Sequence, residues 1–156
     1  MPTASTVLIA QLVLAAICLW AIVSDLRLRR LPNVLALAAL ASGLGFAFAL
    51  HPAAVGLSHL WHALIALVAG LALFAVKWIG GGDAKFYAGV ASWFPLKLAI
   101  PLIGFIALAA IGLFVAFFGI RRIQGKRVFA RGAGDGTALP FGVAIGAAAA
   151  LLFPLT

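Results

Sequence analysis

The feature that most limits how this chain can fold is a succession of long apolar stretches, divided by short segments rich in glycine, proline or basic residues. About 20 apolar residues in a helix cross the ~30 Å hydrocarbon core of a bilayer. Hydrophobic residues fill 66% of the 156 positions and charged residues only 9%, whereas a soluble domain is about half apolar and about a quarter charged. Neither a soluble fold of this size nor a disordered chain fits such a composition. The sequence therefore predicts an all-α, polytopic membrane helix bundle.

We expect about six transmembrane helices in a single integral-membrane domain that covers residues 1–156. The expected helices are Ser5–Ser24, 33–50, Leu57–Ile79, Ala84–Phe94, Leu98–Ile120 and Leu139–Leu155. The fourth segment is too short to cross a bilayer as an upright helix. It is a short helix shielded by its neighbours, a re-entrant piece or part of a broken span.

The basic residues set the expected orientation. With the N-terminus outside and six crossings, ten of the 11 lysines and arginines fall on the cytoplasmic side and only Lys97 falls outside. Without the fourth crossing, five of the ten would move outside, against the positive-inside rule, so we count that segment as a crossing. The net charge of +8 does not indicate nucleic-acid binding, because the bases lie between apolar runs without interleaved aromatic residues. We expect them to meet anionic lipid headgroups instead.

Three aspartates, Asp25, Asp83 and Asp135, are the only acidic residues of the chain. Asp25 and Asp83 fall at the predicted cytoplasmic ends of the first and third helices, where a carboxylate near hydrocarbon is costly and indicates function. Two carboxylates a few ångströms apart share one proton. The ionised partner can take a proton from water while the protonated partner donates to a peptide carbonyl oxygen. This chemistry is aspartyl proteolysis, and the sequence does not say which aspartate carries the proton.

The residues around Asp83 have a role in this interpretation. Gly80, Gly81 and Gly82 can adopt positive φ, turn the chain sharply at a helix end and leave room for a substrate. A glycine run alone is only a helix stop. Lys85 either favours ionisation of Asp83, contacts substrate, or anchors the fourth segment to headgroups. Asp135 is expected to be a solvated loop or cap residue, with a contact to the substrate leader as the alternative.

Three stretches resemble the type IV prepilin peptidases, and more narrowly the short class associated with Tad/Flp-type pili. The first is Ser24-Asp25-Leu26-Arg27-Leu28-Arg29-Arg30-Leu31-Pro32-Asn33, similar to the family's aspartate followed by bases and a hydrophobic-Pro-Asn helix start. The second, Gly80-Gly81-Gly82-Asp83-Ala84-Lys85, matches the family's Gly-x-Gly-Asp-x-Lys. The third, Leu139-Pro140-Phe141-Gly142, resembles a Pro-aromatic-Gly element that opens the last helix.

The resemblance implies an aspartic endopeptidase of the bacterial inner membrane that removes the basic leader of prepilins and pseudopilins at the cytoplasmic face. It assigns catalysis to Asp25 and Asp83, with Gly80, Gly82 and Lys85 as supporting or substrate-binding residues. Larger members also N-methylate the new N-terminus and carry a cysteine-rich metal site in an added region. This sequence has no such insert, and its single Cys18 lies in an apolar run. We therefore expect peptidase activity without methyltransferase activity, metal or cofactor.

Other functions remain open at this point. A small proton- or cation-coupled transporter or channel subunit could use the same aspartates, although both lie at one face rather than at mid-membrane. A non-catalytic membrane assembly factor is a third interpretation. His59 and His62 are expected on an outer loop, where no carboxylate would complete a metal site.

Small residues spaced four apart predict helix-packing faces within the bundle, with a homodimer face as the alternative. The two sets are Gly142, Gly146 and Ala150, and Ala41, Gly45 and Ala49.

Overall fold

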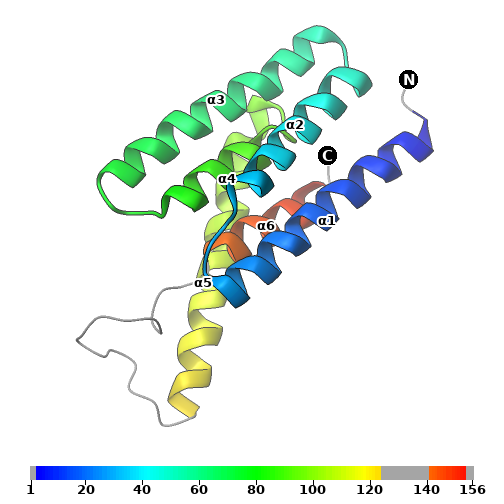
Figure 1. Cartoon of the computed structure of the whole chain (residues 1–156). Helices are drawn as coiled ribbons and strands as arrows, with labels where there is room; N and C mark the ends of the chain where they lie inside the picture. The colour runs from blue at the N-terminus through cyan, green and yellow to red at the C-terminus, as the bar shows by residue number, and fades with distance from the viewer. Residues whose placement is uncertain (1–2, 124–140, 154–156) are drawn as a thin grey trace.

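The structure is a computed structural model that describes residues 3–123 and 141–153, and every regular element in these ranges is helical (Figure 1). The elements are α1 (Ala4–Leu28), α2 (Asn33–Leu50), α3 (Ala53–Ala75), α4 (Gly81–Ala91), the short 3₁₀ helix η1 (Leu96–Leu98), α5 (Ala99–Ile123) and α6 (Phe141–Leu152). The prediction of an all-α membrane bundle is confirmed.

Four of the described helical segments are long and apolar enough to cross a membrane: α1, α2, α3, and η1 with most of α5. The helices α4 and α6, with 11 and 12 residues, rise only about 17 Å at 1.5 Å per residue. Neither spans ~30 Å of hydrocarbon alone. The number of crossings and the outside location of the N-terminus stay predictions.

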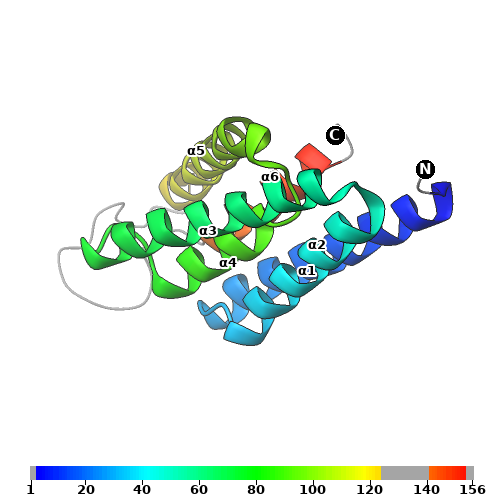
Figure 2. The same ribbon diagram turned by 90° about the horizontal axis from the view of Figure 1, so that it is seen from above.

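The two short helices form the interior of the bundle. α4 packs between α2 and α3, α6 packs between α1 and α5, and the two short helices also touch each other (Figures 1 and 2). Most residues of α4 and α6 are buried, whereas the long helices leave many large apolar side chains more than half exposed, among them Leu12, Val68 and Leu108. Such an apolar outer surface suits a lipid environment.

The chain after α4 continues toward the beginning of α3. The imidazole Nδ1 of His59 donates to the Ser92 carbonyl at 3.0 Å, and that of His62 donates to the Phe94 carbonyl at 2.9 Å. Leu96 N donates to Ser58 Oγ at 3.0 Å. The turn therefore continues the path of the eleven-residue α4 along α3. As a result, α5 begins at the end of the bundle opposite Asp83.

The expectation that His59 and His62 lie on an outer loop is wrong. α3 begins at Ala53, directly after Pro52, rather than at Leu57, and both histidines lie in the first half of this helix. Their exposed fractions are 5% and 1%. Their hydrogen bonds to the turn after α4 make them packing residues of the bundle.

The connection from α3 to α4 also differs from the expectation. α3 ends at Ala75 rather than Ile79, because Lys77 adopts φ 62° and Trp78 N donates to the Leu73 carbonyl at 2.9 Å. Gly80 is extended, with φ −71°, and Gly81 already belongs to α4. The prediction that the glycine run turns the chain through positive φ is therefore wrong, since the left-handed residue here is Lys77.

Candidate active site

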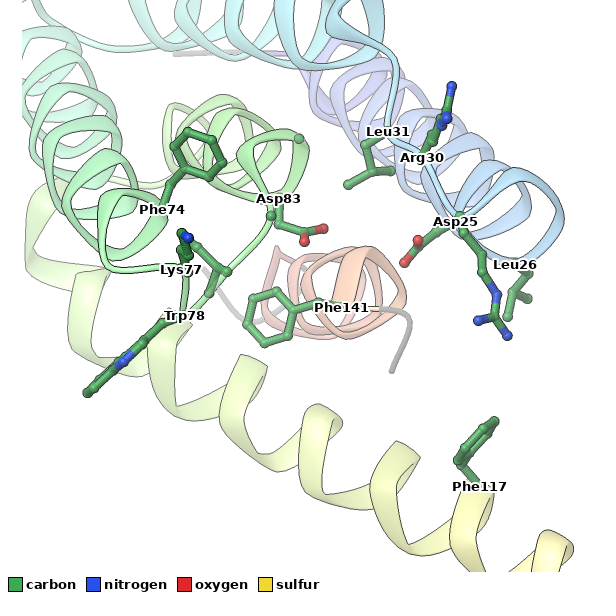
Figure 3. Close-up of a pocket in the computed structure, with 14 residues that line it drawn as sticks. Asp25, Leu26, Arg30, Leu31, Phe74, Lys77, Trp78, Asp83, Phe117 and Phe141 are labelled. Atoms are coloured by element: carbon green, nitrogen blue, oxygen red, sulfur yellow. The ribbon is translucent and has the colours of Figure 1, made fainter. Parts of the chain in front are cut away.

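The two aspartates of the described ranges lie on one pocket at the same end of the bundle. Asp25 occupies the last turn of α1 and is 7% exposed, and Asp83 occupies the first turn of α4 and is partly buried. Both line a pocket of about 940 Å³. Figure 3 shows their carboxylates pointing toward one another from facing helices. Residues 58 positions apart in sequence thus share one solvent-accessible space.

Local hydrogen bonds explain how the chain turns after Asp25. Arg29 takes a left-handed conformation with φ 50°, and its amide donates to the Asp25 carbonyl at 3.0 Å. The Ser24 hydroxyl donates to the Arg30 carbonyl at 2.8 Å. Together these contacts end α1 and direct Leu31 back into the pocket wall, beside the gap between the two aspartates (Figure 3).

The glycines around the pocket are needed for close approach. A Cβ on Gly80 would lie 2.8 Å from Asp83 Oδ2, and one on Gly142 would lie 2.9 Å from both Asp25 Oδ2 and Leu31 Cδ1. A Cβ on Gly82 would lie 3.4 Å from Leu31. Side chains at positions 80 and 142 would displace the carboxylates, so these two glycines set where the aspartates can sit.

The surroundings of Asp83 favour its protonated form more than water does. Burial, and then the neighbouring Asp25 carboxylate, raise the pKa of Asp83 to about 6, against a smaller opposite effect of its hydrogen bond with the Gly80 backbone. Desolvation and a like charge both disfavour the ionised form. Asp83 therefore stays partly protonated in mildly acidic solution.

Asp25 is held from the other side by α6. Its Oδ2 accepts a hydrogen bond from Val143 N at 3.3 Å. Val143 belongs to the first turn of α6, where backbone amides have no partner within the helix. Sequence reasoning identified the Phe141-Gly142 element only as part of a resemblance, and nothing in the sequence indicates that its neighbouring amide reaches Asp25.

Lys85 does not line the pocket. Its Nζ donates to Asn33 Oδ1 at 3.1 Å, which links the first turn of α4 to the first turn of α2. The motif residues therefore have two different positions. Gly80, Gly82 and Asp83 line the pocket, whereas Lys85 links the helix that carries Asp83 to α2.

The remaining pocket wall combines bases with apolar and aromatic side chains. Sequence reasoning did not assign these residues to the site, although five of them belong to the motifs that carry the resemblance. They come from four helices and from the connections that follow α1 and α3. They are Leu26, Arg29, Arg30, Leu31, Phe74, Lys77, Trp78, Ile79, Phe117 and Phe141. The wall can hold an apolar chain with polar groups near its charged rim.

In the parts of the chain that the structure covers, no three histidine, cysteine or acidic side chains gather where they could hold a metal ion. Asp135 and the Leu139-Pro140 part of the third motif lie outside the described residues, so their predicted roles stay untested.

The sequence profile described as the type IV leader peptidase family matches residues 12–120, a stretch that contains both Asp25 and Asp83. No curated protein and no solved structure matches the chain significantly. The profile covers more than half of the sequence and overlaps all four helices that could cross a membrane. The chain therefore belongs to the type IV leader peptidase family, a family of membrane peptidases.

Proposed function

We propose that this chain is a prepilin or pseudopilin leader peptidase in which Asp25 and Asp83 activate a water molecule for attack on the peptide bond. The observation that carries the proposal is the meeting of these two carboxylates, from α1 and α4, on one pocket. Membership in a leader peptidase family supplies the class of substrate. No described residue outside this pocket offers a second pair of acids.

The chemistry follows from a shared proton. Two close carboxylates cannot both ionise readily, so one stays protonated near the operating pH. The ionised partner removes a proton from water, the oxygen attacks the scissile carbonyl carbon, and the protonated partner donates to the carbonyl oxygen. The raised pKa of Asp83, about 6, supports a pair that retains one proton.

The pocket suits a peptide. Its volume of about 940 Å³ is at the upper end of the ~300–1,000 Å³ typical of small-molecule sites. Gly80 and Gly82 contribute backbone without side chains beside Asp83, and Lys85 supports the same helix turn through Asn33. We assign the two glycines to substrate accommodation and Lys85 to positioning of α4.

We further propose that the pocket faces the cytoplasm of a bacterial inner membrane. Arg29, Arg30 and Lys77 line it, whereas Lys97 lies in η1 beyond the turn that reaches Ser58. The positive-inside rule places the base-rich end in the cytoplasm. Anionic lipids at that face would help to recruit a basic leader, so cleavage in liposomes should rise with anionic lipid content.

We propose no methyltransferase activity, because the one cysteine of the sequence, Cys18, is buried in α1.

A homodimer is an additional proposal. The packing-face prediction fits Gly142 and Gly146 of α6, where a Cβ would meet α1 residues, but Ala150 of the same set is exposed, as are Ala41, Gly45 and Ala49 of α2. The three α2 residues are the surface through which a second copy would pack.

The test is cleavage of a purified prepilin by the purified chain in liposomes, with the new N-terminus identified by mass spectrometry. Asp25→Asn and Asp83→Asn should each abolish cleavage, while Asp135→Asn, the matched change at the third acid, should leave substantial cleavage. A pH-sensitive dye inside the liposomes reports proton flux in parallel. Proton flux that depends on Asp25 and Asp83, without any cleavage by the wild type, would overturn the proposal in favour of a transporter.

A further inference from the structure

The two carboxylates of the pair have different surroundings. Asp25 Oδ2 accepts the Val143 amide at 3.3 Å, and the Gly142 amide and the Arg29 guanidinium also act on this carboxylate. Asp83 has one such group, the backbone of Gly80. Amide donors and a cation stabilise a carboxylate more than a carboxylic acid. Burial acts on both groups, and these partners add a difference between them.

The donors to Asp25 come from a helix that carries neither aspartate. Phe141, Gly142 and Val143 open α6, and the amides of a first turn lack partners within the helix and carry the positive end of the helix dipole. Gly142 allows the approach, since a Cβ there would lie 2.9 Å from Asp25 Oδ2. The first turn of α6 is thus shaped to receive an ionised Asp25.

The partner of Asp83 is local. Asp83 is the third residue of α4, and Gly80 is the residue that caps this helix. A side chain at this position that reaches back to the cap amide is one half of a capping box, a contact found at ordinary helix starts. It holds the side chain of Asp83 but does not distinguish the site from other helix termini.

The charged groups that face the pair come from the ends of α1 and α3. They are Arg29, Arg30 and Lys77, besides Asp25 and Asp83 themselves. The described residues of α6 include no ionisable side chain, and α5 contributes Phe117 to the pocket. Arg29 is the base that acts on Asp25.

We propose that Asp25 is the ionised partner that takes the proton from water, that Asp83 is the protonated partner that donates to the scissile carbonyl oxygen, and that the first turn of α6 fixes this division of roles. The inference deepens the proposed function and rests on it. Asp25 and Asp83 are the catalytic residues, and Gly142 and Val143 are positioning residues that act through the Asp25 carboxylate.

The protons balance through the cycle. In the first step Asp25 gains a proton from water, the hydroxide oxygen bonds to the carbonyl carbon, and Asp83 gives its proton to the carbonyl oxygen. In the second step the carbon–nitrogen bond breaks. Asp25 passes its proton to the leaving amine, and Asp83 takes one from the tetrahedral hydroxyl. The pair returns to its starting state with no other reactant.

The test removes one donor without changing a side chain. The α-hydroxy analogue of valine is placed at position 143, so that an ester oxygen replaces the amide N–H. Loss of a hydrogen bond to the ionised form should lower kcat by about tenfold and move the acid limb of the pH profile up by about one pH unit. The same replacement at Val34, in the first turn of α2 and exposed, is the matched control and should change neither by more than about twofold. Val143→Ala, which keeps the amide, should retain the wild-type acid limb.

If the ester variant still cleaves prepilin and the acid limb of its pH profile is unchanged, the division of roles is overturned. If the ester variant does not fold, the wild type decides the question. The chain has three aspartates and no glutamate, so carbon-13 NMR of labelled aspartate carboxyls, assigned with Asp25→Asn, Asp83→Asn and Asp135→Asn, resolves each group. The step at higher pH should belong mainly to Asp83, and its assignment to Asp25 would refute the inference. Persistent cleavage in the first two asparagine variants would instead refute the proposed function itself.

Discussion

Polar side chains have different surroundings at the two ends of the α3–α4 pair. At one end, His59 and His62 each donate to a backbone carbonyl of the turn after α4, and Trp93 Nε1 donates to the Ala39 carbonyl at 2.9 Å. The rings of Trp93 and Phe153 pack edge to face at 5.7 Å. At the other end, Asp25 and Asp83 face each other across an open pocket. The closed end is built for stability, and the open end leaves polar groups available to water and substrate.

The closed end also helps to position α4, the helix that carries Asp83 at the open end. α4 is only 11 residues long, so its direction depends on what holds its termini. Ser92 donates to the Gly89 carbonyl at 2.7 Å, and the histidines hold the two carbonyls beyond it. Lys85 ties the other terminus to Asn33. Substitutions at the two ends should therefore separate catalysis from stability.

The largest expected effect is that of Asp83→Asn. Because an amide cannot supply a proton to the carbonyl oxygen, prepilin cleavage should fall by at least about 10³-fold. Stability should not fall. Folding raises the pKa of Asp83 from 3.8 to about 6, so the folded state binds more protons and stability decreases as pH rises through this window. Asp83→Asn should remove that decrease, as thermal unfolding in detergent between pH 4 and 7 would show. A variant that cleaves normally would place Asp83 outside the chemistry.

A smaller loss of activity is expected for Gly142→Ala. Its Cβ would lie 2.9 Å from Asp25 Oδ2 and must displace the carboxylate, so kcat should fall by roughly 10- to 100-fold. Gly104→Ala in α5 is the control, since a Cβ there meets nothing within 4 Å. That change should leave cleavage unchanged and stabilise α5 by up to about 1 kcal/mol. Equal activity of the two variants in the same assay would contradict the geometry of the Asp25 contact.

The closed end should respond in stability instead. His62→Ala removes a side chain that is 1% exposed together with its hydrogen bond to Phe94. The resulting cavity and unpaired carbonyl should cost about 2–4 kcal/mol. Unfolding in a graded denaturant measures this loss, while kcat of the folded fraction should stay within a few-fold of wild type. A large fall in kcat with unchanged stability would show that the histidine end takes part in catalysis.

Lys85→Met should have the smallest effect. The side chain is exposed, and it makes a single hydrogen bond to Asn33 at 3.1 Å. We expect cleavage within about threefold of wild type and a stability loss below about 1 kcal/mol. A loss comparable to that of Asp83→Asn would show that Lys85 reaches the substrate.

The sequence predicted the helical membrane class and both aspartates because each depends on local signals. Long apolar runs identify helices that face lipid, and acids at the ends of such runs are unusual enough to stand out. The helix ends were less accurate. The sequence contains no mark for the left-handed Lys77 that ends α3 early, since such a residue is normally glycine or asparagine.

The contacts between distant segments could not be predicted. Nothing in the composition of α3 shows that His59 and His62 contact the turn after α4. Two histidines near the end of an apolar helix are equally compatible with a position beside a loop. The Val143 amide that reaches Asp25 is a backbone group and leaves no trace in residue type. Its neighbour Gly142 was visible as part of a motif and of a predicted helix-packing face, but not as a residue that contacts Asp25.

The account depends most on the nearness of positions 25 and 83, and a cross-linking measurement tests it directly. In a Cys18→Ser background, Asp25→Cys with Asp83→Cys should be joined by a short bifunctional thiol reagent in native membranes. The pair Asp25→Cys with Lys97→Cys, which places the second thiol in η1, should not be joined. Cross-linking of the second pair but not the first would contradict a shared aspartate pocket.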